Sequence, residues 1–231
     1  MKKINSYLLI AGCVLITLMS CDDFLTQDPE TALSTKQMFT SIERVEPLVS
    51  GLYVKWKSQK KDRVYLTAMM GNDETEESEA QIVWEVQQSS LDLYNKQLDA
   101  THTLLTQYWN NYWPVISGAA EIIAGIDNVD ADLTIRDALK AEACFLRAAN
   151  YFDLVQYWGA VPMLDYEKQI EFGNKRQPES LIYEYIVNDL TFAAQHLPET
   201  QADKNRVTRI AAKALLGKVY LHASEESGFR D

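Results

Sequence analysis

The sequence predicts an all-α fold in which helical pairs stack and long irregular loops connect them. Five segments carry apolar residues at intervals of three and four, the period of an α-helix that buries one side. Proline, glycine or a capping residue stands near an end of most of these segments, as helix boundaries require. The last two segments are separated by a short loop, which makes them antiparallel neighbours.

The composition agrees with a globular protein of one large domain or two small ones. The chain has 231 residues, of which 47% are hydrophobic and 24% are charged, and it is long enough to bury a core. Its formal net charge is −11 at pH 7. Because so acidic a surface repels phosphate groups, the charge argues against nucleic-acid binding and against peripheral binding to anionic lipid.

The first residues have the pattern of a signal peptide. Lys2 and Lys3 precede an apolar run, Tyr7 to Met19, that is shorter than a transmembrane helix normally requires. The run ends at Ser20 and Cys21, and a small residue followed by cysteine at this place resembles a lipobox. We therefore expect cleavage before Cys21 and lipidation of that cysteine, which anchors the protein in a membrane. The alternative is an ordinary signal peptide with an incidental cysteine.

The chain divides accordingly into three parts. Residues 1–20 form the signal peptide, residues 21–35 a lipidated tether, and residues 36–231 a helical domain. Pro29 and the weak periodicity around it favour a tether over a helix in the second part.

The first helix of the domain is expected over Ser41–Lys57. Pro47 lies inside this pattern and either kinks the helix or delays its regular part. The apolar stripe consists of Ile42, Val45, Leu48, Val49, Leu52, Tyr53 and Trp56.

The connection over residues 58–100 is the least regular part of the chain. Its acidic stretch, residues 72–79, lacks the spacing and the glycine of an EF-hand, so a solvated loop is favoured over a calcium site. Trp84 and Tyr94 also lie here, and aromatic side chains on loops are one indicator of ligand contact. These two residues are the candidate ligand contacts, although packing onto the helices explains them equally well.

A long helical pattern follows over Asp99–Asn128. Pro114 interrupts it and is expected to bend the helix or to split it in two. Trp109 and Trp113 are four residues apart and share a second face of the pattern. A stacked sugar and a neighbouring helix both suit this pair, and we favour packing between helices.

The clearest helix is expected to start at Thr134 and to end at Gly159. Thr134 is the expected N-cap, Gly159 suits the C-terminal end, and Pro162 prevents the helix from resuming. Cys144 is expected to be a small buried residue of this helix. The predicted buried stripe comprises Ile135, Ala138, Leu139, Glu142, Phe145, Leu146, Ala149, Phe152 and Val155.

Two further helices complete the domain. Pro178 suits the first turn of the first of them, and Thr208 is the expected cap of the second. The apolar pattern of the first consists of Leu181, Ile182, Tyr185, Ile186, Asp189, Leu190, Ala193 and Leu197. The pattern of the second consists of Ile210, Ala211, Ala214, Leu215, Val219 and Tyr220.

The last helix also indicates how the pairs stack. Residues 211–223 resemble the first helix of a tetratricopeptide repeat, in which Ala214 and Gly217 are small enough for a close helix crossing. No strict repeat is visible along the chain. The resemblance therefore implies degenerate tetratricopeptide-like stacked helical pairs.

No motif in the sequence carries a known catalytic chemistry. His102, His196 and His222 are not paired with one another, or with Cys or Glu, at metal-binding spacing. The three cysteines form neither a disulfide framework nor a CxxC pair. Nucleophile elbows and glycine-rich phosphate loops are also missing from the sequence. We therefore expect no catalytic residue, no metal and no cofactor.

Glu142, Arg147 and Asp153 are the charged residues best placed for chemistry on the clearest helix. Glu142 and Arg147 are five residues apart, and this spacing does not place them on one helix face. A glycosidase needs two carboxylates across its sugar, but 33 acidic residues always permit some such pair. Their number therefore does not indicate an enzyme.

The sequence of residues 141–162, AEACFLRAANYFDLVQYWGAVP, closely resembles the signature helix of the SusD/RagB family. Three other stretches agree with that family and come in its order: the lipoprotein start around Cys21, residues 108–129 and residues 205–224. Members of the family are surface lipoproteins that help to capture glycans and other nutrients at bacterial outer membranes. The resemblance gives the charged residues of the signature helix a structural role, such as buried pairing between helices.

The resemblance implies a non-catalytic lipoprotein, anchored through Cys21 and exposed on the cell outer membrane. Asp22 and Asp23 fit this location, because acidic residues after the cysteine accompany export to the cell surface in bacteria that carry the family. The implied partners are an oligosaccharide or polysaccharide ligand and a SusC-like TonB-dependent transporter, on which the protein acts as a hinged lid. Two other interpretations stay open: a surface glycoside hydrolase on a helical scaffold, and a tetratricopeptide-like scaffold that binds only protein.

The length of the chain bears on this expectation. SusD-like proteins are commonly much longer than 231 residues, so we expect the N-terminal part of such a protein or a truncated member. Ligand sites that need the missing part are then incomplete, and an apolar face is left exposed.

Overall fold

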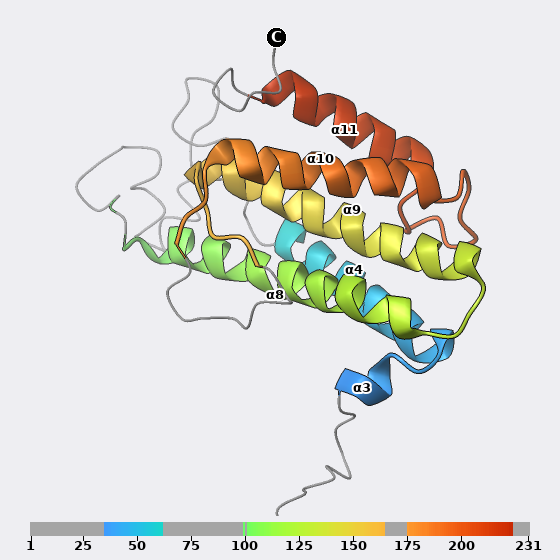
Figure 1. Cartoon of the computed structure of the whole chain (residues 1–231). Coiled ribbons are helices and arrows are strands. Elements are labelled where there is room, and N and C mark those ends of the chain that lie inside the picture. The colour runs from blue at the N-terminus through green and yellow to red at the C-terminus, as the bar shows by residue number, and fades with distance from the viewer. Residues whose placement is uncertain (1–34, 62–98, 100, 165–174, 224–231) are drawn as a thin grey trace, which may run out of the picture. The chain divides into compact units, whose positions relative to one another are not determined.

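A computed structural model describes residues 35–61, 99, 101–164 and 175–223 of the chain. These residues are mainly helical, and residues from Met38 onward belong to one compact unit. Two short extended segments meet in an isolated β-bridge between Pro162 and Arg176. The prediction of an all-α fold is confirmed over this part of the chain. Its helices are α3 (Thr35–Met38), α4 (Ile42–Lys61), α8 (Thr103–Gly125), the 3-10 helix η1 (Ile126–Asn128), α9 (Leu133–Trp158), α10 (Glu179–His196) and α11 (Arg209–His222) (Figure 1).

α9 is the central helix, and it packs against α4, α8, α10 and α11. Every residue from Ala141 to Val155 except Asp153 is buried, so the middle of the helix is enclosed on all sides. The prediction of a single buried stripe was therefore wrong, and Ile135, which belonged to that stripe, is 52% exposed. The physical reason is that neighbouring helices cover several faces of α9, and its alanines let them approach closely.

The ends of α9 confirm one predicted boundary and correct the other. Asp132 is the N-cap, because its carboxylate accepts a hydrogen bond from the N–H of Thr134 at 2.8 Å. Thr134 is thus inside the helix, and its own N–H is one of the unpaired donors that a cap must satisfy. Gly159 ends the helix as predicted, with a φ of 65° that favours glycine.

Two prolines lie inside continuous helices. α4 runs without a break from Ile42 to Lys61, so Pro47 does not delay its start. α8 runs unbroken past Pro114, so of the two outcomes expected for this proline, a bend or a split of the helix, the split does not occur. A proline removes one backbone hydrogen bond, and burial of the adjacent Val115 and Ile116 helps to hold α8 together. No helix within the described ranges is both long and apolar enough to cross a membrane.

α10 and α11 form the expected antiparallel pair (Figure 1). Pro178 is the N-cap of α10, one residue before its first turn. Thr208 caps α11 as predicted, since its hydroxyl oxygen accepts from the N–H of Ala211. The predicted apolar pattern of α11 is partly wrong. Val219 is buried as expected, but the other buried residue is Ala212, which lies outside the pattern. The residues of the predicted pattern that face solvent are Ile210, Ala214 and Tyr220.

Candidate functional site

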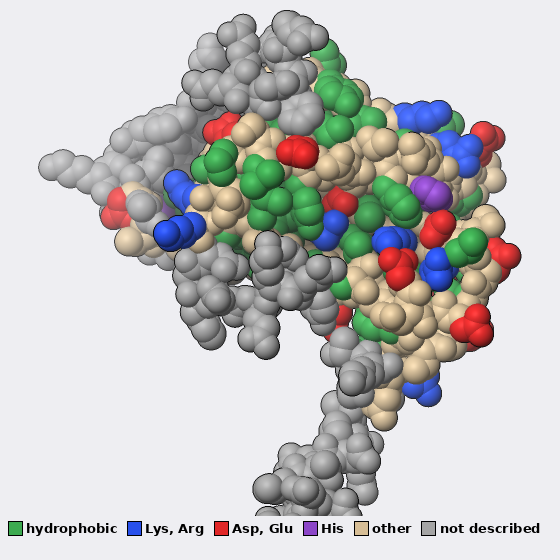
Figure 2. Space-filling model, in the orientation of Figure 1, with side chains coloured by type: hydrophobic (Ala, Val, Ile, Leu, Met, Phe, Trp, Pro, Cys, Tyr) green, Lys and Arg blue, Asp and Glu red, His purple; other side chains and the backbone are tan. Residues whose placement is uncertain are grey.

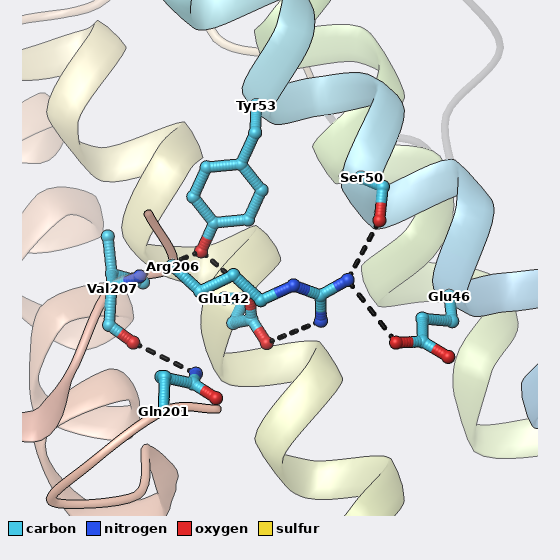
Figure 3. A network of polar contacts seen from close by, with 7 residues as sticks. All are labelled: Glu46, Ser50, Tyr53, Glu142, Gln201, Arg206 and Val207. Atoms are coloured by element: carbon cyan, nitrogen blue, oxygen red, sulfur yellow. Dashed lines mark hydrogen bonds and ion pairs between the residues drawn. The ribbon is translucent and has the colours of Figure 1, made fainter. Parts of the chain in front are cut away.

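Glu142, in the buried middle of α9, is the centre of a polar network (Figure 3). The residue is only 3% exposed. The hydroxyl of Tyr53 on α4 donates a hydrogen bond to Oε2 at 2.6 Å, and Nη1 of Arg206 lies 3.3 Å from Oε1. Both carboxylate oxygens therefore have a partner, and a cation balances the charge.

The same network fastens the loop between α10 and α11 to α4. Nη2 of Arg206 donates to Oγ of Ser50 at 2.8 Å and lies 3.4 Å from Oε1 of Glu46 (Figure 3). The Tyr53 hydroxyl, which donates to Glu142, also accepts from the N–H of Val207 at 3.2 Å. Three parts of the chain that are distant in sequence thus meet at one carboxylate.

Burial sets the protonation of this network. It raises the pKa of Glu142, while the hydrogen bond from Tyr53 and the charge of Arg206 oppose the shift. Burial and the neighbouring Glu142 charge also raise the pKa of Tyr53, so the phenol keeps its proton and donates it in the hydrogen bond. Because the carboxylate is enclosed and engaged by these partners, the arrangement holds helices together and does not present an acid or base to a ligand.

A second buried pair joins α9 to α10. Nε and Nη2 of Arg147 donate to the two carboxylate oxygens of Asp189, each at 2.8 Å. The guanidinium lies 4.4 Å from the centroid of the Tyr185 ring, a cation–π contact. The expectation of buried pairing between helices is confirmed for Arg147. One indication of its partner was visible in the sequence: Asp189 is an acidic residue within the apolar pattern of its helix.

The free thiol of Cys144 lies next to this pair and is buried. Cys144 is 4% exposed, as predicted for a small buried residue. Burial raises the pKa of the thiol well above its ordinary value, and the Asp189 carboxylate adds to the shift. Since the thiolate is the nucleophilic form, burial and the raised pKa disfavour a nucleophilic role for Cys144.

An aromatic row runs between α8, α9 and α10, and we define it as Trp158, Trp109, Trp113, Tyr151 and Tyr185. Its rings meet edge to face, with centroid distances of 5.5, 5.2, 6.4 and 5.6 Å along that order. A sugar platform needs an open ring face, whereas these rings are packed against the core and against one another. The prediction that Trp109 and Trp113 serve packing between helices is confirmed.

The other residues singled out in the sequence are placed as follows. Cys21, Trp84, Tyr94 and the acidic stretch 72–79 lie outside the described residues. Asp153 is half-buried on α9, where its charge adds to the effect of burial in raising the pKa of Tyr112. In the described part of the chain, no three potential metal-binding side chains come together.

The visible surface mixes charges of both signs. On the face in Figure 2, hydrophobic side chains lie in several groups, and basic and acidic side chains are interspersed between them. Exposed ion pairs include Lys140 with Asp127 at 2.6 Å and Arg209 with Glu199 at 3.5 Å. Pairs of this kind contribute little to stability and favour solubility.

Comparison with known proteins places this geometry in a family. The model of the SusD-like family, described as starch-binding and associating with the outer membrane, matches residues 23–221. A SusD-like protein of Bacteroides ovatus is 29% identical over 98% of this chain and 41% of its own. A solved SusD homologue of Bacteroides thetaiotaomicron has a TM-score of 0.65 at 24% identity, over 83% of this chain and 38% of its own.

A further solved structure agrees with the fold. A laminarin-binding SusD-like protein matches with a TM-score of 0.64 at 22% identity, over 79% of this chain and 40% of its own. Such likeness confirms the tetratricopeptide-like helical fold. This chain spans about two fifths of the length of the relatives that it matches.

Proposed function

Since this chain belongs to the SusD-like family of starch-binding proteins that associate with the outer membrane, we propose that it is a non-catalytic, glycan-binding lipoprotein of the cell surface. The observation that carries the proposal is the family match over residues 23–221, which includes every long helix of the fold except the last residue of α11. We further propose that the protein delivers its ligand to a SusC-like TonB-dependent transporter.

The chemistry of the described residues supports binding over turnover. Glu142 and Asp189 are the buried carboxylates of the helical core, and each is paired with an arginine. Hydrolysis of a glycoside needs a carboxylic acid and a carboxylate that face a sugar from opposite sides. Carboxylates enclosed between helices do not meet that requirement, so these residues are scaffold.

The ligand is tested by isothermal titration calorimetry of the chain against soluble starch and laminarin, with an assay for released reducing ends in parallel. We expect heat from binding and no release of reducing ends. Replacing Trp84 or Tyr94 by Ala should weaken the affinity by about five- to tenfold, because loss of stacking costs about 1–1.4 kcal/mol. Tyr220→Ala is the matched control, since that aromatic residue is 44% exposed on α11. Release of reducing ends, or no binding to either glycan by folded protein, would contradict the proposal.

The anchor is tested by metabolic labelling with an alkyne fatty acid in the native host. We expect label on the natural chain and on Cys144→Ser, and no label on Cys21→Ser, because only Cys21 stands at the end of the signal peptide. Label that persists in Cys21→Ser would contradict lipidation at this position.

The transporter is tested by mild detergent extraction of the outer membrane. We expect the protein to co-purify with a TonB-dependent transporter. Recovery of the protein alone, under conditions that preserve a known transporter complex, would contradict the delivery role without affecting glycan binding.

A further inference from the structure

Phe39 packs at the start of the compact helical unit, which begins at Met38. Its side chain is 6% exposed and belongs to the hydrophobic core, although α4 begins only at Ile42. A force that reaches the domain along the chain from its N-terminal side therefore meets Phe39 before it meets α4. The contact that holds this ring decides how firmly the start of the domain is fastened.

The ring of Phe39 lies against Gly125, the last residue of α8. A Cβ at position 125 would lie 2.5 Å from Cε2 and 2.6 Å from Cγ of the ring, and real Cβ atoms do not approach other atoms so closely. The backbone of Gly125 has a φ of −90° and a ψ of −30°, which any residue can adopt. The contact with Phe39, and not the backbone conformation, therefore requires glycine at this position.

A second glycine of α8 holds α4 in the same way. A Cβ at Gly118 would lie 2.8 Å from Cδ2 of Leu52, which is 3% exposed. Gly118 and Gly125 are seven residues apart, so they lie on one side of α8, along which α4 runs (Figure 1). The two glycines thus hold α4 and the residues just before it at two points. Gly51 on α4 is the contrast, because a Cβ there would meet nothing within 4 Å.

We propose that the contact of Phe39 with Gly125 is a clasp that fastens the helical domain to its membrane tether. A pull from the anchor must first draw the ring away from Gly125, and only then can it separate the first turns of α4 from α8. Without the clasp, the same pull acts directly on Ile42 and Val45, and the apolar contacts of α4 break one turn at a time. The role in tethering rests on the anchor at Cys21 proposed above, whereas the contact itself does not.

Hydrogen exchange followed by mass spectrometry tests the clasp in the purified chain. Gly125→Ala and Phe39→Ala should each speed exchange over residues 42–50 by about fivefold or more, because the first overpacks the contact and the second empties it. Exchange in α10 and α11 should not change, since a local opening of α4 leaves them packed on α9. Gly51→Ala is the matched control and should not speed exchange in any helix.

The two substitutions at the clasp should also be non-additive. In the Phe39→Ala background, Gly125→Ala should not speed exchange further, because the ring that collides with the new Cβ is gone. An effect of alanine at position 125 that did not involve the ring would add to that of Phe39→Ala. The double variant therefore separates the clasp from a general loss of stability.

Optical tweezers test the response to a pull. One handle is joined to the first mature residue and the other to a cysteine introduced by Gln107→Cys, at an exposed position of α8. This geometry pulls α4 along α8 and leaves α10 and α11 outside the path of the force. With Phe39→Ala, α4 should detach at a lower force than in the otherwise natural chain. With Gly51→Ala, the force should stay the same.

Three results would overturn the inference. The first is exchange over residues 42–50 that neither clasp variant alters. The second is exchange that rises equally in every helix, which would make the contact ordinary core packing. The third is an unchanged detachment force in Phe39→Ala. Failure of the anchor proposal is a separate outcome, because it appears as missing fatty-acid label on the natural chain and leaves the exchange rates unaffected.

Discussion

Arg147 on α9 and Asp189 on α10 form a bidentate ion pair in which both hydrogen bonds are 2.8 Å long. Their side chains are only 9% and 8% exposed, so water screens the pair little. Planar guanidinium and carboxylate groups that meet in this way have one favourable orientation, which sets how the two helices lie against each other.

The first prediction concerns the removal of one member of this pair. Asp189→Asn keeps the shape of the side chain but leaves the Arg147 cation buried without a counter-ion. We expect the free energy of unfolding to fall by about 3–5 kcal/mol, measured by urea denaturation followed by circular dichroism. The double variant Arg147→Met with Asp189→Leu should recover much of the loss. A loss below about 1 kcal/mol for Asp189→Asn would refute the role of the pair.

The second prediction concerns the Tyr53 hydroxyl. Tyr53→Phe removes the group that donates to Glu142 and accepts from the N–H of Val207. We expect a loss of about 1–3 kcal/mol in the free energy of unfolding, because Glu142 and the N–H of Val207 each lose a hydrogen bond where water does not readily replace it. Tyr220→Phe, at a residue 44% exposed, is the control and should change stability by less than about 0.5 kcal/mol.

A double-mutant cycle sharpens this test. Tyr53→Phe and Glu142→Gln act on two groups whose oxygen atoms lie 2.6 Å apart. The coupling energy between them should exceed about 0.5 kcal/mol. Additive losses would mean that the contact does not contribute to stability.

The third prediction concerns pH. Burial raises the pKa of Glu142 above its ordinary value of 4.5. A carboxyl whose pKa is higher in the folded than in the unfolded state binds its proton more tightly when folded. Its ionisation therefore lowers stability as the pH rises from about 4.5 through the raised value, with no further effect above it.

The measurement compares the natural chain with Glu142→Gln by urea denaturation at several pH values from about 4 to 8. The free energy of unfolding of the natural chain minus that of the variant should fall across the window and then level off. A difference that rises with pH would show that Arg206 and Tyr53 outweigh burial, and that the pKa of Glu142 lies below 4.5.

The fourth prediction contrasts two glycines. Gly159 has a φ of 65°, and a Cβ there would lie 3.0 Å from Oε1 of Glu179, so Gly159→Ala should lower stability by about 1 kcal/mol or more. Gly217 is helical with open space around it, so Gly217→Ala should raise stability by about 0.5–1 kcal/mol. Thermal denaturation of the two variants should move the midpoint in opposite directions, and a shift in the same direction would contradict this account.

Local sequence was sufficient for the helices themselves. The five long helices, the end of α9 at Gly159 and the cap of α11 at Thr208 follow from periodicity and from residues within one turn of each boundary. The N-terminal end of α9 was predicted less well, because two nearby residues are both suitable N-caps. Asp132, and not the expected Thr134, is the N-cap. The family, too, was recognisable from short motifs in order, because each motif is a continuous stretch of chain.

Contacts between distant residues were beyond such reasoning. Glu142 meets Tyr53 and Arg206, which are 89 and 64 residues away, and nothing in the spacing of the sequence pairs them. The same holds for the burial of α9 on all sides and for the exposed side of α11. The sequence by itself determined an all-α chain of the SusD-like family, since a helix depends on neighbours three and four residues away. Only the tertiary structure decided which charges are paired and which face stays open, because those depend on how separate helices pack in space.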